Sequence, residues 1–332
     1  MQRPGIDQAI RDTLADLPAV AVAGSCICVD PSGVDPHVYE LVPAGAASFE
    51  FWRGDYRGKG RQVLAPPAVT GNSVAASARM IYDPIGTGTP AAPVPCIWLV
   101  FSESQAPWMN FQRYTIGTNA WAARGILGAM VAALPYDLSL AHVSGMRNYS
   151  SGTPMLSDDV IWMNVGPGAL PGGGGLGSDI AFYRKTTNAW TVLTGANGAR
   201  TGAPGAGTSL DFVQLYAGRL VSVRGGGSNL IDSYDVNGDA WADVSPQPRT
   251  ETWAEGTETA TIWKEYVSLF LAHNGRLYEM IGGRMDTLES IDGDDGTAHK
   301  GLGLAGYNLG GASFLIIRPH GKQEVQRIQL VR

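Results

Sequence analysis

A tyrosine and a tryptophan stand seven residues apart at three places in this sequence, with residues rich in Gly, Asn and Thr between them. The pairs are Tyr114 and Trp121, Tyr183 and Trp190, and Tyr234 and Trp241. The intervening stretches KTTN and VNGD have the chemistry that tight hairpin turns favour. We therefore expect each Tyr and Trp to lie on adjacent antiparallel strands, where both rings can be buried.

Apolar segments precede these pairs and repeat along the chain. CIWLVF leads to the first pair, VIWMNVG leads to the second, and CICVD and SFLIIRP mark weaker copies near the two ends. The segment GRLVSVRGGGSNLIDSYD, which starts at Gly218, aligns without a gap with GRLYEMIGGRMDTLESID, which starts at Gly275. This offset of 57 includes a shared glycine doublet, Gly225–Gly226 and Gly282–Gly283. The pattern predicts a repeat architecture.

Six units of this kind fit the chain. Their predicted limits are near residues 19–64, 65–130, 131–195, 196–250, 251–305 and 306–332. A unit of about 50 residues has the length of one four-stranded sheet with its loops. The abundance of glycine, with 44 copies spread along the chain, agrees with many short strands joined by turns.

An apolar hairpin, a glycine doublet and a Tyr followed by a Trp resemble the kelch repeat, and the resemblance covers about residues 96–292. It implies an all-β, kelch-like β-propeller with six blades. Ala298 stands where the fifth unit would carry its Trp, and two units keep the glycine doublet. On this interpretation the six aromatic residues pack between blades. The competing interpretation is a surface on which bases or sugars stack.

The first 18 residues differ from the rest. Ile6, Ile10, Leu14 and Leu17 have helical spacing, which predicts an amphipathic helix over residues 6–17 in an amino-terminal arm of residues 1–18. Its apolar face would cap the propeller of residues 19–332 or dock on a partner. Residues 19–24, AVAVAG, would then supply the strand that closes the ring against the last unit.

Composition narrows the function. The net charge of −6 and the pI near 5.4 disfavour a surface that attracts nucleic acid throughout. The amino terminus lacks the pattern of a signal peptide, and the apolar segment 125–134 is too short to span a bilayer. Cys26 and Cys28 are two residues apart and Cys96 is remote, which predicts reduced core thiols in a protein made in the cytoplasm.

A search for chemistry gives no catalytic motif. HExxH, GxSxG and GxxxxGK[ST] do not occur, and the five histidines are far apart in the sequence. The segment 233–239 partly matches a calcium loop, but Ser233 replaces the first Asp and Val244 stands at the position of the bidentate Glu. We therefore expect no catalytic residue, no metal and no cofactor.

A propeller without a catalytic motif is expected to be a structural subunit that uses its fold as a protein-binding scaffold. It resembles the propeller portion of short-tailed bacteriophage nozzle, or tail hub, proteins. The resemblance implies a virion protein made in the host cytoplasm, in the tail hub or the adsorption apparatus, in contact with other virion proteins and copies of itself. DNA would pass through a channel without sequence-specific contacts.

The alternative is a carbohydrate-binding or carbohydrate-active propeller that uses the central funnel. It predicts that Arg, Asp, Glu and Tyr side chains converge at one end of that funnel and shift one another's pKa values.

Overall fold

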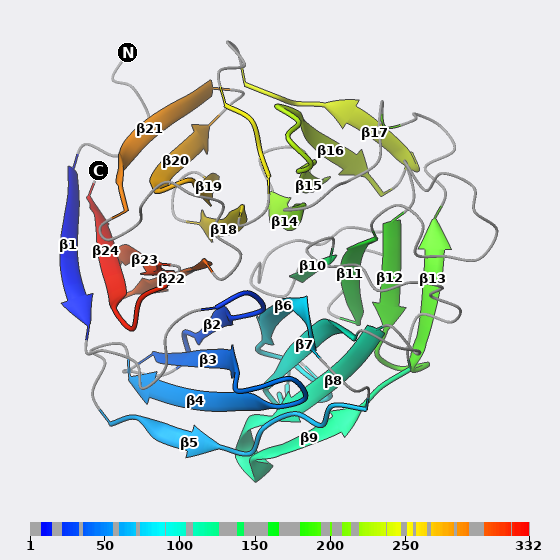
Figure 1. Cartoon of the computed structure of the whole chain (residues 1–332). Coiled ribbons are helices and arrows are strands. Elements are labelled where there is room, and N and C mark those ends of the chain that lie inside the picture. The colour runs from blue at the N-terminus through cyan, green and yellow to red at the C-terminus, as the bar shows by residue number, and fades with distance from the viewer. Residues whose placement is uncertain are drawn as a thin grey trace.

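Six four-stranded antiparallel sheets are arranged around a central axis in the computed structural model (Figure 1). The structure describes residues 8–14, 22–32, 36–55, 60–70, 74–89, 91–103, 109–125, 138–142, 159–165, 180–193, 200, 208–213, 219–236, 238–246, 251–254, 257–263, 267–281, 284–291, 302–319 and 321–331. The chain is therefore an all-β, six-bladed propeller. None of the helices in these ranges is long and apolar enough to cross a membrane.

The strands follow one another outward from the axis in each of the first five blades. Blade 1 contains β2 (Cys26–Asp30), β3 (His37–Pro43), β4 (Phe49–Asp55) and β5 (Gln62–Leu64). Blade 2 contains β6 (Val74–Asp83), β7 (Cys96–Glu103), β8 (Met109–Thr115) and β9 (Ala120–Ala123), with a 3-10 turn, η1 (Ile116–Thr118), before β9. Blade 3 contains β10 (Leu138–His142), β11 (Val160–Val165), β12 (Ile180–Arg184) and β13 (Ala189–Leu193).

The other half of the ring has the same layout. Blade 4 contains β14 (Ser209–Val213), β15 (Arg219–Val223), β16 (Ile231–Asp235) and β17 (Ala240–Asp243). Blade 5 contains β18 (Glu258–Trp263), β19 (Val267–His273), β20 (Arg276–Ile281) and β21 (Arg284–Ser290). Blade 6 contains β22 (Gly303–Leu309), β23 (Ala312–Arg318), β24 (Val325–Val331) and, as its outermost strand, β1 (Gln8–Leu14).

The innermost strands form the closed ring. Each first strand contacts the first strand of the next blade, in the circle β2, β6, β10, β14, β18, β22 and back to β2. The hydrophobic core lies between the blades, because each described cluster of buried apolar side chains combines residues from two adjacent sheets. Second strands are accordingly buried on both faces, as along all of β7.

The amino-terminal segment is a strand, and the prediction of a helix there was wrong. Residues Gln8–Leu14 pair antiparallel with β24, so that Ile10 lies opposite Gln329 and Leu14 opposite Val325. Ile6 and Leu17 lie outside the described residues. The closing strand therefore comes from residues 8–14 rather than from 19–24, and the pairing of β1 with the carboxyl-terminal β24 overrides the local helical spacing.

The alignment at an offset of 57 is out of phase with the blades. It matches β15, the second strand of blade 4, with β20, the third strand of blade 5. The shared feature is a glycine-rich hairpin, and any two successive antiparallel strands need one. Gly225 and Gly226 have φ of 70° and 63° in the turn between β15 and β16, whereas Gly282 and Gly283 lie outside the described residues.

Candidate functional site

The predicted aromatic pairs lie on the two outer strands of blades 2, 3 and 4. In each pair the Tyr on the third strand stands directly opposite the Trp on the fourth. The ring centroids are separated by 5.1 Å for Tyr114 and Trp121, 5.4 Å for Tyr183 and Trp190, and 4.9 Å for Tyr234 and Trp241. All six rings belong to clusters that join their blade to the preceding one.

A residue in a left-handed conformation completes each of these hairpins. Asn119, Asn188 and Asp239 have φ of 49°, 53° and 47°, a region that Asn and Asp tolerate better than most residues. Each accepts a hydrogen bond from the hydroxyl of the hairpin's Tyr, at 3.0, 2.6 and 2.5 Å. We name this arrangement of Tyr, Asn or Asp, and Trp the outer clasp. The sequence suggests the turn but not the tyrosine contact.

Two of the outer clasps hold the chain segment that arrives from the preceding blade. In blade 2, Asn119 Oδ1 accepts the N–H of Ala65 at 3.1 Å, while the indole of Trp121 donates to the Ala65 carbonyl at 2.7 Å. In blade 3, Asn188 Oδ1 and the Trp190 indole bind the N–H and carbonyl of Gly125 at 3.1 and 2.6 Å. The clasp thus satisfies both backbone groups of one linker residue.

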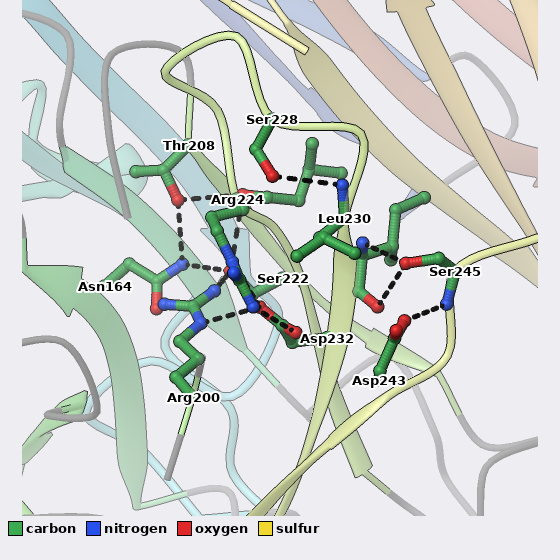
Figure 2. Close-up of polar contacts among 12 residues, drawn as sticks. Asn164, Arg200, Thr208, Ser222, Arg224, Ser228, Leu230, Asp232, Asp243 and Ser245 are labelled. Carbon is green, nitrogen blue, oxygen red and sulfur yellow. Dashed lines mark hydrogen bonds and ion pairs between the residues drawn. The ribbon is translucent and has the colours of Figure 1, made fainter. Parts of the chain in front are cut away.

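The junction of blades 3 and 4 contains a buried ionic cluster (Figure 2). Arg200 Nε donates to Asp232 Oδ2 at 2.8 Å, and Arg224 donates to both carboxylate oxygens of Asp232 at 2.9 and 3.1 Å. The Arg200 guanidinium also lies 4.1 Å from the centroid of the Trp241 ring, a cation–π distance. Asp232 therefore faces two cations in a site closed to solvent.

Neutral polar groups extend this cluster to blade 3. Ser222 Oγ accepts from Arg200 and from Asn164 Nδ2, the latter at 2.7 Å, and Thr208 donates to the carbonyl of Val223 at 2.9 Å. Burial lowers the pKa of Arg200 to about 10, although Asp232 raises it. Because strands β11, β15 and β16 all contribute, the cluster ties two sheets together and its charge is directed inward.

A second ion pair crosses the axis of the ring. Arg79 on β6 and Glu258 on β18 approach to 2.9 Å, and their blades are opposite one another in the circle of first strands. Their side chains are only 13% and 12% exposed. Burial raises the pKa of Glu258 to about 7, and Arg79 lowers it in part. The pair of Arg79 and Glu258 thus bridges the axis of this propeller.

The three thiols are free and buried. Burial is the main cause that raises the pKa of Cys26 to about 12, and it raises the pKa values of Cys28 and Cys96 well above their usual range. A thiolate is the nucleophile and the metal ligand, so these groups are poorly suited to either task.

The other titratable groups are dispersed. His37, His142 and His273 belong to blades 1, 3 and 5, and His299 and His320 lie outside the described residues. Within the described ranges, no group of three His, Cys, Asp or Glu side chains could hold a metal ion. In the suspected calcium segment, Asp235 pairs with Arg219 at 3.2 Å. This carboxylate therefore belongs to the hairpin and its neighbouring strand.

Comparison with known proteins establishes the fold. No protein-family model matches the sequence, and no curated protein sequence matches it. Among solved structures, an Aleuria aurantia lectin mutant in complex with α-methyl-L-fucoside is similar, with a TM-score of 0.57 and 14% identity over 94% of this chain and 93% of that one. A second structure of an Aleuria aurantia lectin is described as a six-bladed β-propeller, with a TM-score of 0.56 and 14% identity.

Proteins with other activities share the same architecture. The GH93 α-L-arabinofuranosidase of Fusarium graminearum, in complex with arabinobiose, has a TM-score of 0.58 and 8% identity over 96% of both chains. A protein of unknown function from Bacteroides thetaiotaomicron has a TM-score of 0.56 and 10% identity over 97% of this chain and 76% of that one. At these identities the likeness concerns the fold alone, and the chain is a six-bladed β-propeller.

Proposed function

We propose that the chain is a non-enzymatic structural subunit whose propeller is a protein-binding scaffold in a larger assembly. The observation that carries this proposal is the pair of Arg79 and Glu258 across the axis. A binding funnel needs polar groups that are free to meet a ligand. Here Arg79 and Glu258, two charged groups at the axis, are buried against each other, which favours binding at the outer surfaces of the ring.

Other interior charges have the same structural use. Asp83 at the end of β6 binds Lys185 of blade 3 at 2.9 Å and accepts the Trp98 indole at 2.9 Å. Asp232 neutralises arginines at the next junction. These contacts join neighbouring blades, and they support a ring that keeps its shape while partners bind outside it.

The assembly that we propose is the tail of a short-tailed bacteriophage, with this chain in the hub or nozzle or in the adsorption apparatus. The proposal rests on the propeller fold and on the acidic character of the sequence. Because an ion pair bridges the axis of each ring, DNA in such a particle would pass between copies of the chain rather than through one propeller.

Purification of the tagged chain from its native source tests this proposal. We expect it in a particle of high mass that contains several copies of itself, visible by electron microscopy. The recombinant chain should associate with itself or with other virion proteins in light-scattering measurements. A chain that stays monomeric at all concentrations and never enters a particle would contradict the proposal.

The second candidate is a carbohydrate-binding propeller, and one observation favours it. Arg79 and Glu258 converge at the axis, and the pKa of Glu258 near 7 lies in the range of groups that transfer protons. The variant Glu258→Gln separates the two candidates. For a scaffold it should change stability and leave partner binding intact, whereas a funnel site should lose its sugar, measured by glycan array and calorimetry.

A further inference from the structure

Two arginines of blade 2 face the junction with blade 3. Arg113 on β8 stands opposite Ala122 on β9, and the N–H of Arg124 donates to the carbonyl of Phe111 at 2.9 Å. Directly paired residues on antiparallel strands project from the same face. Arg113 and Arg124 therefore share the face of Phe111, whose ring lies 4.9 Å from that of Tyr183 in blade 3.

These two guanidiniums repel each other. Burial lowers the pKa of Arg113, and the charge of Arg124 is the next largest cause. The groups that act in the opposite direction are Cys96 and Tyr183. Both are neutral at pH 7, because burial raises the pKa of each. The local balance is thus two positive charges.

The Nε atoms of Arg113 and Arg124 lack a hydrogen-bond acceptor among the described residues. Both Nε atoms are buried. Within the same part of the chain, no carboxylate forms an ion pair with Arg113 or Arg124, whereas nearby Lys185 binds Asp83 at 2.9 Å. Unmet donors of a charged group are unfavourable, and an acceptor that entered this site would stabilise them.

The preceding junction provides an internal comparison. Arg53 of blade 1 lies beside Tyr114 and favours the ionised form of that hydroxyl, as Arg113 and Arg124 do for Tyr183. Arg53, however, donates to Oε1 of Gln62 at 2.6 Å. The equivalent junction one blade further on has two guanidiniums and no such acceptor.

We propose that the Arg113–Arg124 pair binds an oxyanion, a carboxylate, sulfate or phosphate group, at the junction of blades 2 and 3. The guanidinium forks match the geometry of such groups and give charge-assisted hydrogen bonds. Both arginines are partly exposed, so the anion can reach them from solvent. This site is independent of the scaffold function, and it gives the outer surface a preference for acidic ligands.

Thermal unfolding and calorimetry with inorganic sulfate, inorganic phosphate and glucuronate test the proposal, against sodium chloride at equal ionic strength. We expect at least one of the three anions to raise the Tm of the wild-type chain and to bind it. Arg113→Gln and Arg124→Gln should each weaken that binding by about tenfold or more, because each removes a charged hydrogen bond. Arg53→Gln is the matched control and should bind as the wild type does.

The pattern of responses decides the outcome. The anion that binds most tightly identifies the class of ligand: sulfated, phosphorylated or carboxylated. The proposal is overturned if the wild-type chain responds to none of them beyond chloride, or if Arg113→Gln and Arg124→Gln bind as well as wild type. Both substitutions are at partly exposed positions, and circular dichroism checks that each variant is folded.

Discussion

The junction of blades 2 and 3 and the junction of blades 3 and 4 use the same outer clasp with different chemistry. At the first, Phe111 covers Trp190 with ring centroids 5.0 Å apart, and the clasp residue is Asn188. At the second, the Arg200 guanidinium lies 4.1 Å from the Trp241 ring, and the clasp residue is Asp239. A hydrocarbon ring covers Trp190, whereas a cation covers Trp241.

This difference shows which part of the clasp is fixed by the fold. The Tyr, the left-handed residue and the Trp are set by strand register and turn geometry, which are alike in both blades. The group that covers the Trp comes from the preceding blade or its linker and is free to vary. An arginine there needs a buried acid, and Asp232 supplies it.

The largest effect is expected from removal of that acid. Asp232→Asn removes the buried carboxylate that Arg200 and Arg224 share, and we expect a loss of about 3–5 kcal/mol in unfolding free energy. Chemical denaturation measures it. Asp235→Asn on the same strand is the control, because its pair with Arg219 is about one-third exposed and should contribute at most about 1 kcal/mol. Equal losses of unfolding free energy in both variants would show that the buried cluster stabilises the fold no more than the exposed pair does.

The axis should respond to pH between the ordinary pKa of Glu258 and its raised value in the folded chain. The pKa of Glu258 is about 7 in the folded chain against its usual 4.5, so the folded state holds a proton that the unfolded state releases. Its contribution to stability is therefore present below pH 4.5 and falls by about 3 kcal/mol as the pH rises to about 7. Arg200, at about 10, titrates elsewhere.

Glu258→Gln removes this dependence. The wild-type unfolding free energy should fall relative to that of the variant between pH 4.5 and 7, and the difference should be constant above pH 8. Denaturation curves at several pH values measure it. Parallel profiles over the whole range would mean that Glu258 has an ordinary pKa in the folded chain.

The clasp residue itself should have an intermediate effect. Asn188→Ala removes the acceptor for the Tyr183 hydroxyl and the Gly125 N–H and places Ala at φ 53°, so we expect a loss of about 1–3 kcal/mol. Asn188→Gly keeps the backbone relaxed and loses only the acceptor. A smaller loss for Gly than for Ala, by thermal denaturation, separates the two causes, and identical losses would exclude backbone strain.

The smallest effect is expected at the charged clasp. Asp239→Asn converts it to the side chain that the neutral clasps use, and Asn can still accept the hydroxyl of Tyr234. Unfolding free energy should change by less than about 1 kcal/mol. Burial is the main cause that raises the pKa of Tyr234, and Asp239 raises it further, so the variant should lower that pKa, measured by ultraviolet titration. A large loss of stability would show that the charge of Asp239 is required at this junction.

Local patterns predicted much of the fold. The spacing of Tyr183 and Trp190 predicted a hairpin, and the two residues stand directly opposite each other in it. This pairing could be predicted because it depends only on the turn between the two residues. The apolar run CIWLVF marked one of the repeating units, and it forms β7, a strand that is buried along its whole length. The six repeating units of the sequence correctly predicted six blades. Counting was possible because the strands of each blade are contiguous in the sequence, except in blade 6, where β1 is added.

Features that depend on partners distant in the sequence could not be predicted from local patterns. Ile10 and Leu14 have helical spacing, but they pair with residues of β24 at the other end of the chain. The two glycine doublets look alike whether the hairpin joins the second and third strands or the third and fourth, so the alignment could not set the phase. The pairs of Arg79 with Glu258 and of Arg200 with Asp232 join residues whose sequence neighbourhoods carry no shared motif.

The bond between Arg79 and Glu258 changes how the energetics of this ring should be described. In an open array of repeats, stability is close to a sum over units and their nearest neighbours. Here blades 2 and 5 are not neighbours in the ring, yet one ion pair couples them directly. Substitutions at these two positions should therefore be non-additive, and the cooperativity of unfolding extends across the diameter of the ring as well as around it.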